Sequence, residues 1–105
     1  MTIIDRFEAM LGAGRDNPLL RFSLGSEYLK NDELARAAVH LRAAVEQDAH
    51  YTAAWKLLGK TLAKSDDQAG AIEAFGRGIA VAEQRGDKQA AKEMRVFLRR
   101  LQPPD

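Results

Sequence analysis

Three lysines have the most distinctive charge spacing in this sequence. Lys56, Lys60 and Lys64 lie four residues apart, so on a helix they share one face, and no acidic residue lies between them on that face. A row of ammonium groups is suited to attracting carboxylates. We therefore expect these lysines to attract an acidic peptide or a C-terminal carboxylate. The alternative is an ordinary solvated helix face.

Residues that could support catalysis or metal binding are few. His40 and His50 lie ten residues apart with no paired carboxylate at metal-ligand spacing, so we expect both side chains to be exposed to solvent. Asp66 and Asp67 favour the start of a helix rather than a catalytic pair. The sequence has no cysteine, and it shows no Ser-His-Asp arrangement and no phosphate-binding glycine loop. We expect a protein that is not an enzyme and that has no metal or other cofactor.

The composition indicates a single domain with no membrane segment. At 105 residues the chain can form one core, and its apolar residues form no run approaching the roughly 18 that span a bilayer. Residues 1 to 11 lack the uninterrupted apolar segment of a secretory signal, so we expect a cytoplasmic location. The net charge of +1 and the lack of interleaved exposed aromatic residues argue against nucleic-acid binding, although residues 88 to 100 are basic.

Apolar residues spaced by three and four predict six helices and no strands. We expect these helices at residues 3 to 12, 18 to 30, 33 to 47, 52 to 64, 66 to 85 and 87 to 101. The polar residues between them are suited to capping helix starts. The expected caps are Thr2, Asn17 before Pro18, Asn31 with Asp32, Ser65 with Gln68 as a capping box, and Asp87 after Gly86. Pro103 and Pro104 should end the last helix.

The sequence repeats itself with a period of 34 residues. The matching pairs are Leu24 and Leu58, Gly25 and Gly59, Tyr28 and Leu62, Ala37 and Ala71, and Leu41 and Phe75. A glycine at positions 25 and 59 lets a neighbouring helix approach closely, while larger residues one turn away fill the space beside it. The first helix matches the second half of the same period, because Phe7 precedes Leu41 by 34 residues.

These residues resemble the tetratricopeptide repeat family, whose unit has the pattern W-x2-L-G-x2-Y followed by A, F and A. One copy is matched by Trp55, Leu58, Gly59, Ala71 and Phe75, and the other by Leu24, Gly25, Tyr28, Ala37 and Ala44. The sequence departs from the pattern at Arg21, which replaces the tryptophan, and at Arg95, which replaces the glycine in the last helix. The resemblance implies an all-α antiparallel solenoid with a right-handed superhelix. Residues 1 to 12 would form a half repeat, 18 to 51 and 52 to 85 two full repeats, and 87 to 101 a capping helix.

The resemblance also implies where a partner would bind. In this family the first helix of each pair lines a concave surface that holds extended peptides, whereas Trp55 and Phe75 occupy core positions. The partner-binding residues implied for this chain are Phe22, Ser26, Leu29, Lys56, Lys60, Lys64 and Lys92. On the last helix, Val96 and Arg99 would continue the surface beside Lys92.

We therefore expect a non-catalytic protein–protein interaction module. A peptide or partner segment would occupy the groove, its apolar side chains against Phe22 and Leu29 and its acidic residues steered by the lysines. A different reading is a structural module that self-assembles through its terminal helices, where Ile3, Phe7 or Phe97 would meet another copy. The chain would then be a weak homodimer rather than a monomer.

Overall fold

The computed structural model describes residues 1–103 and shows helices without strands in that part of the chain. The helices are α1 (Ile3–Gly12), α2 (Pro18–Lys30), α3 (Leu34–Gln47), α4 (Thr52–Lys64), α5 (Gln68–Gln84) and α6 (Lys88–Leu101). The predicted all-helical class is confirmed, and every helix lies within a few residues of its expected bounds. Helix α6 ends two residues before Pro103, whereas Pro104 lies outside the described residues.

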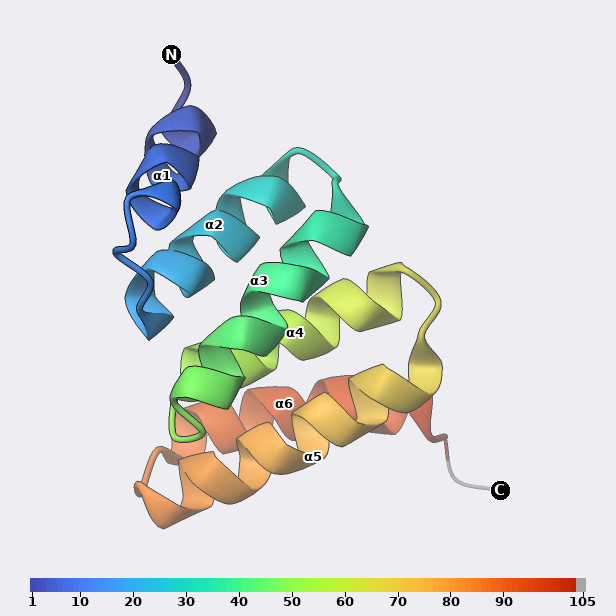
Figure 1. Cartoon of the computed structure of the whole chain (residues 1–105). Helices are drawn as coiled ribbons and strands as arrows, with labels where there is room; N and C mark the ends of the chain where they lie inside the picture. The colour runs from blue at the N-terminus through green and yellow to red at the C-terminus, as the bar shows by residue number, and fades with distance from the viewer. Residues whose placement is uncertain (104–105) are drawn as a thin grey trace.

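The six helices run back and forth and stack in chain order (Figure 1). Each helix packs mainly on its neighbours in the sequence, and α4 also contacts α2 and α6. Helix α1 packs on α2 at one end of the stack, and α6 covers α5 at the other (Figure 1). The result is an elongated molecule of 48 × 28 × 18 Å, as expected when each added helix pair extends a row.

Three of the predicted helix caps are present. The Thr2 hydroxyl accepts a hydrogen bond from the Asp5 amide at 3.1 Å, and the Asp5 carboxylate accepts one from the Thr2 amide at 3.1 Å, which forms a capping box. Asn17 and Asp87 each accept a hydrogen bond from a backbone N–H in the first turn of α2 and α6, at 2.8 and 3.0 Å. These short polar side chains satisfy amide donors that the helix leaves unpaired.

The predicted caps of α3 and α5 are wrong. Ser65 donates its hydroxyl back to carbonyl oxygens of α4, and Asp67 caps α5 instead. At the start of α3, Glu33 occupies the cap position without a side-chain hydrogen bond. Asp32 and Asp66 both have left-handed backbone conformations, with φ of 59° and 62°. These residues lengthen each turn, so the next helix begins later than the side-chain pattern indicated.

The core is a row of large side chains along the stack. The largest fully buried side chains are those of Leu24, Leu41, Leu58, Phe75 and Met94, together with Thr61. Trp55 is also buried, and its indole N–H donates a hydrogen bond to the Ala49 carbonyl oxygen at 2.8 Å. The prediction that Trp55 and Phe75 belong to the core is therefore confirmed.

The predicted close helix approach at Gly25 and Gly59 is also confirmed. A Cβ atom at Gly25 would lie 2.5 Å from the Leu41 side chain on α3, and one at Gly59 would lie 2.6 Å from the Phe75 ring on α5. Both distances are shorter than a carbon–carbon contact allows. The repeated glycine thus sets the distance between the two helices of each pair and brings Phe75 against α4.

Candidate functional site

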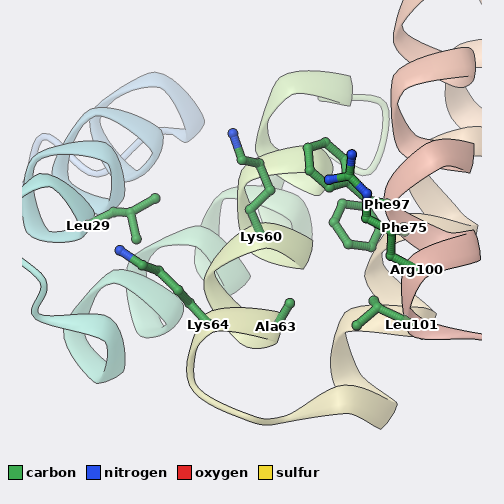
Figure 2. A pocket seen from close by; sticks show the side chains of 8 residues that line it. All are labelled: Leu29, Lys60, Ala63, Lys64, Phe75, Phe97, Arg100 and Leu101. Carbon is green, nitrogen blue, oxygen red and sulfur yellow. The ribbon is translucent and has the colours of Figure 1, made fainter.

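An open pocket of about 530 Å³ lies between α4 and α6 and extends toward α2. Its walls come from four helices, and Figure 2 shows the side chains that line it. The lining residues are Leu29 from α2, Lys60, Ala63 and Lys64 from α4, Phe75 from α5, and Phe97, Arg100 and Leu101 from α6. The volume falls within the roughly 300–1,000 Å³ that is typical of ligand pockets.

The centre of the pocket is an aromatic pair. The rings of Phe75 and Phe97 are stacked with centroids 5.4 Å apart and planes 7° apart. Phe75 is buried, whereas Phe97 is half-buried and presents part of its ring to the pocket. The end of α6 is held in place because Gln68 donates a hydrogen bond to the Leu101 carbonyl oxygen at 2.7 Å. The pocket therefore has an apolar wall fixed by the core below it.

Three cationic side chains surround this apolar wall. The Lys60 ammonium lies 5.5 Å from the centre of the Phe97 ring, and the Arg100 guanidinium lies 5.7 Å from the same point. Lys64 lies one turn beyond Lys60 and faces Asp32 at 3.5 Å. In Figure 2 the two lysines rise from α4 on one side, and Arg100 lies beside Phe97 on the other. Within residues 1–103, neither Lys60 nor Arg100 has an ion-pair partner, so their charges remain available to an anion.

The third lysine of the row, Lys56, is neutralised by a neighbouring helix. Its ammonium lies 2.9 Å from a carboxylate oxygen of Glu93 on α6. This hydrogen bond is the largest cause of a lowered pKa of Glu93, and a hydrogen bond from Gln89 is the second largest. The sequence of α4 does not show that Glu93 approaches this row of lysines from α6, or that Asp32 approaches it from the turn after α2. The available charge is concentrated at Lys60 and at Arg100.

Some of the predicted partner-binding residues line the pocket, and the others lie outside it. Leu29, Lys60 and Lys64 line the pocket. Phe22 lies outside it, half-buried against Tyr51 with ring centroids 5.1 Å apart, and Ser26 is half-buried elsewhere on α2. The exposed Lys92, like Lys56, is not among the lining residues.

Sequence reasoning missed the contribution of α6 to the pocket. The pocket uses Phe97, Arg100 and Leu101, whereas the repeat register placed Val96 and Arg99 on the binding surface beside Lys92. The signal that could have identified the correct face is the pair Phe97 and Leu101, because apolar residues four apart share one face of a helix.

Relatives of the chain occur among both sequences and solved structures. No protein-family model matches the sequence. A curated TPR repeat-containing protein of Pseudomonas aeruginosa is 54% identical over 99 residues, which cover 94% of both proteins. The chain belongs to the tetratricopeptide repeat family.

Solved structures agree with this assignment. A Bordetella parapertussis protein, known from a solution structure, is 51% identical to this tetratricopeptide repeat chain and has a TM-score of 0.82. That match covers 96% of this chain and 88% of the other. A crystal structure of a tetratricopeptide repeat domain protein from Salinibacter ruber is 28% identical with a TM-score of 0.77, covering 86% of this chain and 100% of the other. Tetratricopeptide repeat proteins generally serve as non-catalytic protein-interaction modules, and their partners are typically other proteins.

A second polar cluster joins the first three helices of this tetratricopeptide repeat protein. His40 is buried and stacked on Tyr28, with ring centroids 5.5 Å apart and planes 4° apart. Its Nδ1 lies 3.1 Å from an Arg21 guanidinium nitrogen, and its Nε2 lies 3.4 Å from a Glu8 carboxylate oxygen. The expectation that His40 is exposed is therefore wrong, whereas His50 is exposed as predicted. The sequence around His40 could not show that its ring is buried, since the partners of the ring come from α1 and α2.

The charges around His40 determine its protonation. A guanidinium can only donate hydrogen bonds, so Nδ1 must accept and the proton of the neutral ring lies on Nε2, toward Glu8. Burial lowers the pKa of His40, and Arg21 lowers it further, whereas Glu8 and Asp16 raise it. Asp16 itself accepts hydrogen bonds from Arg21 at 2.8 and 2.9 Å and from Gln47 at 2.9 Å. These bonds lower the pKa of Asp16 to about 2.

Within residues 1–103, no three histidine, aspartate or glutamate side chains are grouped so that they could hold a metal ion. No helix in this range combines the length and apolar character needed to cross a bilayer. The pocket between α4 and α6 is thus the arrangement in the described residues with the clearest binding chemistry.

Proposed function

We propose that this tetratricopeptide repeat protein binds a segment of a partner protein in the groove formed by α2, α4 and α6. The observation that supports this most directly is the pocket of about 530 Å³, whose apolar wall is bordered by the cations of Lys60 and Arg100. Leu29 and Lys64 belong to the same pocket. The flanking surface would include Phe22, Ser26, Lys56 and Lys92.

The proposed mechanism divides the binding energy between two effects. Burial of partner side chains against Phe97 and Leu101 supplies affinity, at about 25 cal/mol per Å² of apolar surface removed from water. The cations at the rim steer acidic residues of the partner toward the groove and set its orientation. No group in the pocket needs to react, which agrees with the non-catalytic character of the family.

Photo-crosslinking and charge reversal together test this function. A photoreactive residue at Ala63, which lines the pocket, should capture the partner protein, whereas one at the exposed Ala80 on α5 should not. Binding of the captured partner should weaken by about tenfold in Lys60→Glu, and its salt dependence should decrease. Lys56→Glu should also weaken binding. It removes a positive charge beside the groove and replaces the ion pair with Glu93 by repulsion between two carboxylates.

The matched control for charge reversal is Lys88→Glu. Lys88 is exposed at the start of α6 and lies outside the pocket, so this variant has the same charge change without altering the groove. Unchanged affinity in Lys60→Glu would contradict the electrostatic part of the proposal. Equal capture at Ala63 and Ala80 would contradict the groove itself.

A second candidate function is self-assembly through α1. This helix has no buried residue, and Ile3 and Met10 are 50% and 36% exposed. An apolar helix at the end of a repeat stack is a suitable contact for another copy. Sedimentation at several concentrations tests this candidate: a sedimentation coefficient that rises with concentration supports it, and a constant monomeric value excludes it.

A further inference from the structure

We propose that the pocket recognises a specific short motif in the partner, in which a large apolar residue is flanked by an acidic side chain. This inference rests on the proposed function and adds the chemistry of the bound segment. In this arrangement the carboxylate lies between Lys60 and Arg100, and the apolar side chain contacts the exposed part of Phe97.

The first argument is that two like charges converge on one ring. Lys60 approaches Phe97 from α4 and Arg100 approaches it from α6, with the charged groups 5.5 and 5.7 Å from the ring centre. The negative face of an aromatic ring attracts each cation, but the two cations repel each other. A carboxylate placed between them reduces this repulsion and gains two charge-assisted contacts. Within residues 1–103 no acidic side chain pairs with either cation.

The second argument is that the other basic residues nearby are already paired. Lys56 is paired with Glu93 at 2.9 Å, and Lys64 faces Asp32 at 3.5 Å. Arg95, also on α6, is paired with Glu83. Within residues 1–103 Lys60 and Arg100 form no such ion pair, and Lys60 interacts with Glu93 only at longer range. An incoming carboxylate therefore meets the least neutralised cations at the end of the groove where the apolar wall is exposed. Because the cations and the exposed apolar wall lie side by side, they favour a motif in which the acidic and apolar side chains are close together in the sequence.

The third argument concerns the apolar part of the motif. Phe97, Leu29, Ala63 and Leu101 are half-buried and all face the pocket, so their exposed surface is left without an apolar neighbour. Figure 2 shows Leu29 across the pocket from Phe97, with the side chains of α4 between them. One large side chain entering here would cover apolar surface on three helices at once.

Short synthetic peptides test the motif directly. The first probe is acetylated and amidated and has a phenylalanine between two glutamates; the second replaces both glutamates by glutamine, and the third replaces the phenylalanine by alanine. We expect the first probe to shift the amide resonances of Lys60, Ala63, Phe97 and Leu101 in a heteronuclear NMR titration. The second and third probes should each bind about threefold to tenfold more weakly.

Protein variants provide the reciprocal test. Lys60→Gln and Arg100→Gln should each weaken the first probe by about threefold to tenfold and leave the second unchanged. Lys88→Gln removes one exposed lysine outside the pocket and should leave all three affinities unchanged. Because these residues are exposed, unchanged circular dichroism and melting temperature are expected and show that each variant is folded.

Several outcomes would overturn the motif. Equal binding of the first and second probes would exclude recognition of the carboxylate, and equal binding of the first and third would exclude recognition of the apolar side chain. If only a version with a free C-terminus binds, the ligand is a terminal carboxylate and not an acidic side chain. If every probe fails while the crosslinker at Ala63 still captures a partner, the motif is wrong and the proposed function stands.

Discussion

At the N-terminal end of the stack, α1 packs on α2 and has no fully buried residue, whereas at the C-terminal end α6 packs on both α5 and α4 and buries Ala91 and Met94. Helix α1 reaches α3 through the contact of Glu8 with His40. Helix α6 adds the stacked pair of Phe97 and Phe75 to its buried residues.

This difference shows that the two ends of one repeat stack are stabilised by different interactions. Apolar burial holds α6, and its contribution depends little on pH or on salt at moderate concentration. Partial burial and a polar cluster hold α1, and contacts of this kind weaken when a charge is removed or screened. Most of the residues that line the pocket between α4 and α6 belong to the end that is held by burial.

The largest expected effect comes from truncating a methionine at each end. Met94 is fully buried, so Met94→Ala should lower the free energy of unfolding by about 2–5 kcal/mol. Met10 on α1 is 36% exposed, so Met10→Ala should change the free energy of unfolding by about 0.5 kcal/mol or less. Urea denaturation followed by circular dichroism measures both. Equal losses in the two variants would mean that α1 is as firmly packed as α6.

A smaller and more local effect is expected from Glu8→Gln. The substitution removes the carboxylate that faces His40 at 3.4 Å, and a partly exposed pair of this kind contributes about 0–1 kcal/mol. Hydrogen exchange should become faster in α1 and remain unchanged in α4 and α5. Glu46→Gln on the exposed side of α3 is the matched control. Faster exchange throughout the molecule would show that α1 does not open separately.

The smallest expected effect is a pH dependence that originates at His40. The pKa of His40 is lower in the folded protein than its ordinary value of 6.5, so the unfolded chain binds more protons in the interval below pH 6.5. The stabilising contribution is therefore complete above about pH 6.5 and decreases as the pH falls through the folded pKa. Urea midpoints should therefore rise with pH from about pH 5.5 to about pH 6.5 and change little from there to pH 8.

Substitution of each histidine separates this contribution from other titrations. His40→Gln should reduce the slope of the urea midpoint against pH, whereas His50→Gln, at an exposed position, should leave it as it is in the unmodified protein. A slope that survives in His40→Gln would assign the pH dependence to another group.

The sequence predicted those features that depend on one helix or on the repeat. The 34-residue period located Leu24, Leu58 and Phe75 in the core, and the short-range spacing of polar residues found the caps at Thr2 and Asn17. Both kinds of pattern involve residues that are close in the chain or that recur at a fixed distance. The family and the all-helical fold follow from the same information.

The sequence did not predict contacts that depend on how separate helices are rotated against each other. His40 was wrongly expected at the surface, since its partners come from α1 and α2. The pairing of Lys56 was not predicted, since its partner Glu93 lies on α6. The place of Arg100 in the pocket was missed for the same reason, since it depends on how α6 is rotated against α4. Only Leu29, Lys60 and Lys64 of the predicted binding residues reached the pocket.

The composition of the pocket has a mechanical consequence. It collects Leu29 from α2 and Arg100 from α6, two helices that do not pack on each other within residues 1–103. A stack joined mainly through successive neighbours behaves as an elastic rod, whose softest motions are bending and twisting along its length. A molecule that fills the pocket acts as a strut between α2 and α6. Occupancy would therefore stiffen the rod and reduce its range of curvature.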